Sequence, residues 1–344
     1  MKMLLTSFRA EFHNRMLDLL WRQWTTLGIT GQGSPFERTV LDPEALLITS
    51  CTIARHDPRL FDAILDWVNI NGRYLNIHRL HRILTKYPFT GGNVYAAVAA
   101  TVSNSEHVIK WERSAKPAQP PGQPEESLFL MEDAKPLPVV HEPDPVYKTH
   151  GLLRDRYEPR RVAQQFNPEI TANLLLRLRA FLGVSARCEI LAYLLLNKHG
   201  SPRAIARACG YYPATVTKAL TEMGDSGYVM SRVEGRHRHY TLTPDVWPVL
   251  LIEKELPSWI NWTQLFCALE QTWNFLHSFG LADQEPLAQA SSLRRFVKTS
   301  IADNITASGL PVVFGDDKQH IGESLIPFFI ARIRAVLTAI EQLE

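Results

Sequence analysis

The sequence is poor in cysteine and contains no long apolar run. Four cysteines occur among 344 residues, far apart and without a CxxC pair; this spacing excludes a disulfide scaffold and predicts reduced thiols. No stretch reaches the ~18–20 uninterrupted apolar residues that a membrane helix needs. The apolar run before Arg9 is also too short for a signal peptide. We therefore expect a cytoplasmic protein with no membrane partner.

Signatures of catalytic and cofactor sites are missing as well. The chain has no P-loop, no GxSxG and no GxGxxG placed between a strand and a helix. His78 and His81 share one face of an expected helix, but no third ligand stands near them at zinc spacing. We expect a protein that is not an enzyme and that holds no metal and no cofactor.

What the sequence does contain is the composition of a globular protein of two or three domains. The chain is 45% hydrophobic and 21% charged, with 37 Lys and Arg against 35 Asp and Glu, a net charge of +2. If this charge were spread evenly, it would argue against a nucleic-acid partner. The expected fold class is mainly α, because most apolar residues recur at helical spacing.

Composition divides the chain into four expected parts. Residues 1–110 are a helical N-terminal domain, and residues 111–157, which hold eight of the 22 prolines, are a linker or an extended arm. Residues 158–250 contain a DNA-binding domain, and residues 251–344 form a helical C-terminal domain.

Local signals add detail to these parts. Asp42-Pro43 and Asp57-Pro58 are each expected to begin a helix, with Asp as the N-cap and Pro at the first helical position. A further helix is expected from Glu158 through Phe181. Within the arm, Leu128–Met131 could dock onto a neighbouring domain.

Residues 186–244 carry the most specific pattern. Apolar spacing predicts a helix that ends near Gly200 and a short helix that begins at Ser201-Pro202 and ends at Gly210. After a turn, another helix is expected over Ala214–Asp225. A helix, a short helix, a turn with glycine and a second helix are the arrangement of a helix-turn-helix.

A hairpin is expected directly after these helices. Tyr228–Val233 and His237–Thr243 have strand patterns on either side of a tight turn at Glu234–Arg236, which completes a winged helix. The stretches "ATVTKALTEM", "GYV" and "SRVEGRHRHYTLT" resemble bacterial winged-helix transcription regulators of the MarR and ArsR type. This resemblance covers about 60 of the 344 residues.

The positive charge is concentrated in the same segment. Residues 186–244 contain eight Lys and Arg against four Asp and Glu, a net charge of +4, so the other 285 residues carry −2. Residues 1–110 carry twelve basic and nine acidic residues, whereas residues 257–344 carry six and nine. Because phosphate contacts supply most of the affinity for DNA, the local excess favours double-stranded DNA as a partner.

Twelve side chains are candidates for DNA contact. With Val216, Leu220 and Met223 turned inward, the opposite face of helix 214–225 would enter a major groove, and the hairpin tip would reach a minor groove or phosphates. The candidates are Arg203, Arg207, Tyr211, Tyr212, Thr215, Thr217, Lys218, Thr221, Arg232, Arg236, His237 and Arg238. Tyr211 or Tyr212 could instead be a core residue.

The expected function is that of a sequence-specific, DNA-binding transcription regulator, a repressor that acts as a homodimer on two half-sites. The alternative is a non-catalytic antitoxin or scaffold whose winged helix binds protein. The stretches "LLWRQW" and "DPRLFDAILDW" resemble regulator or antitoxin partners of nucleotidyltransferase toxins.

The flanking regions leave two further choices open. The helix pair 57–84 is either a second DNA-contacting module or a helical bundle with a solvated basic face; the basic residues of its second half are Arg73, His78, Arg79, His81 and Arg82. The C-terminal aromatic residues either pack a core or form a surface for dimerisation or a protein partner.

Overall fold

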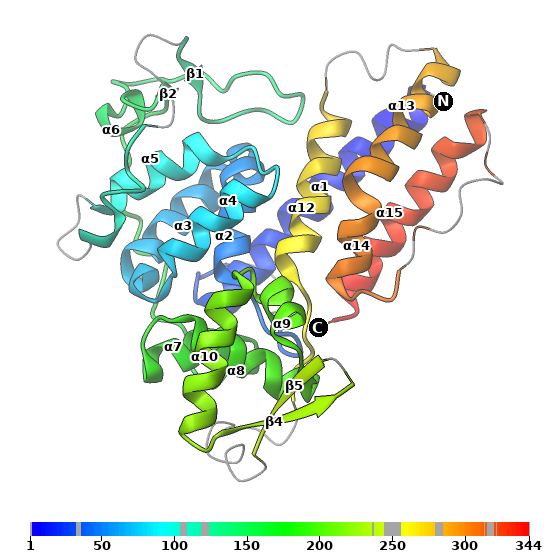
Figure 1. Cartoon of the computed structure of the whole chain (residues 1–344). Coiled ribbons are helices and arrows are strands. Elements are labelled where there is room, and N and C mark those ends of the chain that lie inside the picture. Colours follow the sequence, from blue (N-terminus) through cyan, green and yellow to red (C-terminus); the bar gives the residue numbers. More distant parts are fainter. Residues whose placement is uncertain are drawn as a thin grey trace.

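The computed structural model describes residues 2–31, 36–103, 109–117, 124–235, 237–243, 256–278, 285–312, 314, 320 and 322–343. The chain is mainly helical, as the sequence predicts, and the described residues form two small sheets (Figure 1). None of the helices in these ranges combines the length and the apolar character needed to cross a bilayer.

Helices α1–α5 contain most of the first hundred residues. The carboxylate of Asp42 accepts a hydrogen bond from the Ala45 amide at 3.1 Å, and Asp57 caps the next long helix in the same way. Both predicted helix starts are therefore confirmed. The bounds are α1 (Lys2–Leu27), α2 (Pro43–Ile53), η1 (Ala54–His56), α3 (Pro58–Asn71), η2 (Gly72–Tyr74), α4 (Ile77–Lys86) and α5 (Gly92–Ser103).

The described part of the proline-rich segment is an arm that packs on these helices. Leu128 and Phe129 are buried, and the Phe129 ring meets Phe61 edge to face at 5.6 Å between centroids. Arg55 donates hydrogen bonds to the carbonyls of Ser127 and Leu128, both at 2.8 Å. The elements of the arm are η3 (Ile109–Trp111), β1 (Glu126–Ser127), α6 (Pro145–Lys148) and β2 (Leu152–Leu153), with β1 and β2 parallel.

The prediction of a helix from Glu158 through Phe181 is wrong over its first half. Residues 158–170 are not helical, and the chain becomes helical at η4 (Thr171–Asn173) and α7 (Leu174–Leu182). The amide of Gln164 donates to the carbonyl of Gly28 at 2.8 Å. These backbone groups pair with distant parts of the chain, and Pro159 and Pro168 lack the amide hydrogen that a continuing helix would use.

Residues 174–242, which we call the central unit, fold as helices against a three-stranded sheet. The sheet order is β3-β5-β4, with both pairings antiparallel and Val233 opposite Arg238 in the hairpin. The two hairpin strands lie where the sequence predicts them. After α7, the elements are α8 (Ala186–Asn197), β3 (His199–Gly200), α9 (Pro202–Cys209), α10 (Pro213–Asp225), β4 (Val229–Glu234) and β5 (His237–Leu242).

The C-terminal helices lie beside the N-terminal ones (Figure 1). Their largest aromatic side chains, including Trp262, Phe266, Trp273 and Phe329, are buried in the core. Packing inside the chain is thus the observed use of these residues. The bounds are α12 (Trp262–Leu276), α13 (Pro286–Phe296), the π-helix η7 (Val297–Ile301), α14 (Ala302–Ser308), η9 (Gly322–Ser324) and α15 (Leu325–Glu341).

The buried apolar residues form two clusters. One runs through the N-terminal helices, the arm and the C-terminal helices, and we call this part of the molecule the helical body. The other holds the central unit together, and Val40 joins it from outside that unit. The helical body is completed by long-range contacts between its two ends, such as the ion pair of Arg15 on α1 with Glu341 on α15 at 2.7 Å.

Candidate nucleic-acid interface

The outer face of α10 is exposed and polar. Its inner face buries Val216, Leu220 and Met223 against the core of the central unit, as predicted. The positions on the opposite face are exposed. They include Thr215, Thr217, Lys218 and Thr221, with Ala214 before them and Glu222 after them. The middle of the helix therefore presents three hydroxyl groups and one ammonium group, and the exposed carboxylates of Glu222 and Asp225 follow toward its end.

The preceding helix and turn fix the start of α10. The hydroxyl of Ser201 caps α9 by accepting from the Ala204 amide at 3.3 Å, and Pro202 occupies the first turn. Gly210 ends α9 with a φ of +75°, a left-handed conformation that glycine adopts without a steric penalty. Arg203 and Arg207 of α9 are exposed.

The two tyrosines of the turn have different environments. Tyr211 is buried, and its hydroxyl accepts a hydrogen bond from the Asn76 side chain of α4 at 2.8 Å. Tyr212 is 66% exposed, and the Arg82 guanidinium lies 3.4 Å from the centre of its ring. Only Tyr212 is thus positioned to meet a partner molecule, while Tyr211 takes the core role that the sequence had left open.

The hairpin adds further cations. Arg232 on β4 and Arg238 on β5 are exposed. The other two hairpin candidates are not placed: Arg236 and the side chain of His237 lie outside the described residues.

The exposed surface is more basic than the residue count alone indicates. Of the four acidic residues in segment 186–244, Glu189 is buried and Glu222 pairs with Arg187. Two of the four carboxylates are thus taken up by other groups, and a surplus of positive charge remains around the exposed cations of α9 and α10, which are Arg203, Arg207 and Lys218. Such an arrangement attracts a polyanion from solution.

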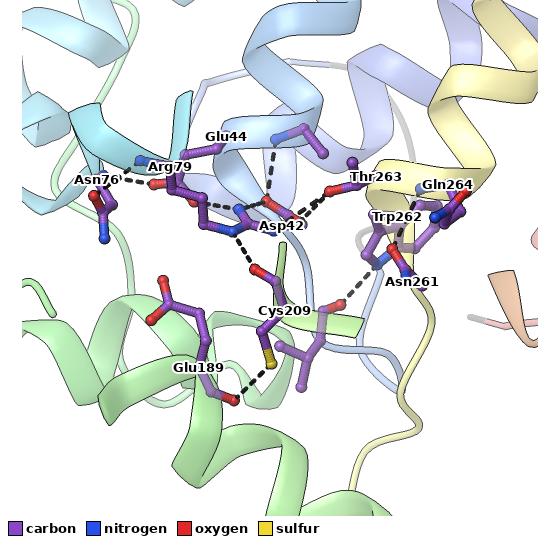
Figure 2. A network of polar contacts seen from close by, with 12 residues as sticks. Asp42, Glu44, Asn76, Arg79, Glu189, Cys209, Asn261, Trp262, Thr263 and Gln264 are labelled. Carbon is purple, nitrogen blue, oxygen red and sulfur yellow. Dashed lines mark hydrogen bonds and ion pairs between the residues drawn. The ribbon is translucent and has the colours of Figure 1, made fainter. Parts of the chain in front are cut away.

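A network of buried charges joins the central unit to the helical body (Figure 2). Arg79 of α4 is 3% exposed, and it donates to the Asp42 carboxylate at 2.6 Å and to Glu44 at 2.8 Å. Its Nε atom also donates to the carbonyl of Cys209, the last residue of α9, at 2.9 Å. One side chain thus links α2, α4 and the end of α9.

A second buried arginine continues this network. Arg179 of α7 donates to both carboxylate oxygens of Glu44, at 2.7 and 2.8 Å, and to Glu189 of α8 at 2.5 Å. Both arginines are paired with carboxylates in bidentate or bridging geometry, which is the arrangement that compensates best for lost hydration.

Sequence reasoning missed the role of α4. Arg79 was expected on a solvated basic face or in a second DNA-contacting module, and both expectations are wrong for this residue because it is buried in the network. Three polar residues of this region recur every three positions and reach the end of α9 and the turn after it. Asn76 and Arg82 donate hydrogen bonds to Tyr211, and Arg79 donates to the carbonyl of Cys209. The spacing was visible in the sequence, but the partners are more than 120 residues away.

Other chemistry is sparse. The described residues contain no group of three or more His, Cys, Asp or Glu side chains that could hold a metal ion. The four cysteines are free and buried. No family model matches the chain, and no curated protein or solved structure is significantly similar to it.

Proposed function

We propose that the chain is a sequence-specific DNA-binding transcription regulator that reads DNA with a winged helix-turn-helix formed by residues 186–244. The order of helices α8, α9 and α10 and the antiparallel β3-β5-β4 sheet support this assignment. In it, α10 is the recognition helix and β4–β5 is the wing.

The observation that carries the proposal is the outer face of α10. Its middle part, between Ala214 and Glu222, exposes only threonine and lysine side chains, namely Thr215, Thr217, Lys218 and Thr221. Threonine and lysine donate to phosphates and to base edges, so this face suits a major groove. The wing arginines Arg232 and Arg238 extend the basic surface toward the flanking phosphates.

The alternative, a winged helix that binds a protein, predicts a different surface. Protein interfaces are enriched in aromatic and apolar anchors at their centre. The outer face of α10 has no such anchor, and Tyr212 stands at its edge with Arg82 over its ring. The exposed apolar side chains Met230 and Val233 lie on β4, away from this helix face. The polar face therefore favours DNA over an antitoxin or scaffold role, and homodimeric binding to two half-sites remains a prediction.

The test is the double substitution Lys218→Ala with Arg238→Ala in the full chain. DNA would be selected from a genomic fragment pool, and the affinity for a labelled selected duplex would be measured by fluorescence anisotropy at several salt concentrations. We expect the affinity to fall by about tenfold or more, and the slope of log affinity against log salt to decrease by about two, one per lost phosphate contact.

The matched control is Arg59→Ala with Lys135→Ala, which removes two exposed cations from the helical body. This variant should bind the duplex like the unaltered chain. Equal affinity and equal salt slope for both double variants, each with an unchanged melting temperature, would contradict the proposal and favour a protein-binding role.

A further inference from the structure

A pocket of about 340 Å³ lies where α4 meets the central unit. Its apolar walls are Leu75 and Ile77 from the start of α4 and Val184 from the turn between α7 and α8. Its volume is near the lower end of the range of about 300–1,000 Å³ found for small-molecule sites. The pocket thus suits a small ligand and touches both parts of the molecule.

The ionisable side chains around this pocket are all basic. Lys110 and Arg113 supply its cations, whereas partial burial lowers the pKa of His81, so that its ring is neutral at neutral pH. His78, His81, Lys110 and Arg113 line it, and its described lining includes no Asp or Glu. Lys110 is held in place because its ammonium group donates to the carbonyls of Arg73 at 2.7 Å and Leu75 at 3.2 Å. These groups form a set of positively polarised donors that favours an anion.

The positions of two donors are set before any ligand arrives. The His81 ring lies 2.9 Å from the Ser114 hydroxyl, measured from Nε2 to Oγ. Partial burial lowers the pKa of Lys110 to about 8, so a bound anion would favour its protonated form. Binding should therefore take up protons above this pH.

A larger pocket, of about 850 Å³ beside the arm, has a different character. Arg154, Arg156 and Arg160 line it, but Asp62 and Asp155 do so as well, and Arg154 is already paired with Asp62 at 2.8 Å. Its charges are compensated within the chain. The smaller pocket is the one whose charge calls for an external partner.

We propose that the pocket at the start of α4 binds a small organic anion, with a phosphate group among the four basic side chains and an apolar part against Leu75, Ile77 and Val184. A phosphate carries close to two negative charges and several acceptor oxygens, so it can engage more donors at once than a carboxylate can.

The site is connected to the proposed DNA-reading surface through α4. Asn76 lines the pocket, and its side-chain Nδ2 donates to the hydroxyl of Tyr211, in the turn just before α10. Arg82, further along α4, donates to the Tyr211 carbonyl at 2.8 Å. We therefore infer that occupancy of the pocket changes the affinity for DNA. This second part rests on the proposed function, whereas the anion site itself does not.

The anion site is tested without DNA. Phenyl phosphate and inorganic phosphate would be titrated into the full chain by calorimetry at constant ionic strength, with Arg113→Gln as the pocket variant and Arg156→Gln as the control from the larger pocket. We expect phenyl phosphate to bind more tightly than inorganic phosphate, because of the apolar walls. Arg113→Gln should weaken its binding about fivefold or more, an effect typical of losing one charge-assisted hydrogen bond, and Arg156→Gln should not. A second pocket variant, Lys110→Gln, checks that the effect is not specific to Arg113.

Two results would overturn the site: no binding of either probe up to about 10 mM, weaker than any useful affinity, or equal binding by the unaltered chain and both pocket variants. The coupling is then tested by the ratio of DNA affinities with and without phenyl phosphate. The ratio should differ from one by about fivefold or more in the unaltered chain and approach one in Arg113→Gln. A ratio of one in the unaltered chain would refute the coupling, and so would an equal ratio in both proteins, which would show that the probe only competes with DNA. A chain that binds the probe but no DNA would refute the proposed function alone.

Discussion

Buried carboxyl groups at two polar junctions of the molecule have pKa values shifted in opposite directions. At the junction with the central unit, burial alone would raise the pKa of Asp42, but the charge and hydrogen bonds of Arg79 hold it below its usual value. At the junction of α12 with Thr90, Glu270 accepts from the Thr90 amide at 2.7 Å and from its hydroxyl at 3.0 Å, and burial raises the pKa of Glu270 to about 7. A cation within reach decides whether a buried carboxyl group stays ionised.

The comparison separates two kinds of stability. The junction around Arg79 includes Asp42, whose pKa lies below its usual value, so its ion pair with Arg79 persists across the neutral pH range. The junction around Glu270 depends on a group that changes its charge in that range. The stability of the first junction should therefore fall when one partner is removed, whereas the stability of the second should change with pH.

The largest expected effect is the loss of a buried cation. Arg179→Met keeps much of the side-chain volume but leaves Glu44 and Glu189 without their shared partner. We expect the free energy of unfolding to fall by about 3–5 kcal/mol, the range found when one member of a buried ion pair is removed. Urea unfolding at pH 7 measures this. A loss below about 1 kcal/mol would mean that the pairing contributes no more than a surface pair does.

The second prediction concerns protons. Because the folded-state pKa of Glu270 lies above the usual 4.5, its contribution to stability is complete below about pH 4.5 and is lost as the pH rises to about 7. Glu270→Gln removes this loss, so the variant should gain stability relative to the unaltered chain between pH 5 and pH 8, by up to about 3 kcal/mol. Melting curves across this range provide the measurement, and parallel pH profiles for the two proteins would exclude the explanation.

The smallest effect is expected for an ion pair of the same chemistry at the surface. Arg187 pairs with Glu222, and their side chains are 51% and 40% exposed. Arg187→Gln should cost less than about 1 kcal/mol, because water compensates for most of the lost attraction. Urea unfolding beside Arg179→Met makes the comparison direct. If the two variants lost the same stability, burial would not be the feature that distinguishes the pairs.

Much of the fold could be predicted because its signals are local. Asp42, Asp57 and Ser201 cap helices at the places that the sequence indicates, and the hairpin strands follow from their own composition. The outward direction of Thr215, Thr217 and Lys218 also follows, because Val216 and Leu220 fix which face of α10 is buried.

The predictions that were wrong concern residues whose partners lie far away in the sequence. Arg79 looks like a surface residue within its own helix and is buried only because Asp42, Glu44 and Cys209 converge on it. Residues 158–170 have a helix-like pattern, yet Gln164 hydrogen-bonds Gly28 instead. No local window of sequence contains both members of these pairs, so periodicity and propensity could not reveal them.

The core shared by the two ends of the helical body governs the order in which the protein can form during synthesis. Phe8 of α1 packs edge to face with Phe329 of α15 at 6.3 Å between centroids, about 320 residues later in the chain. The part of α1 around Phe8 thus lacks this partner until α15 has left the ribosome, whereas Trp24 at the other end of α1 already packs against Trp67 of α3. The core of the central unit comes from residues 174–242 and from Val40, which precedes them in the chain, so it can form while the C-terminal helices are still being translated. A newly made chain can therefore form its α10 surface before its helical body is complete, and the apolar surface that waits longest for its partner is the one around Phe8.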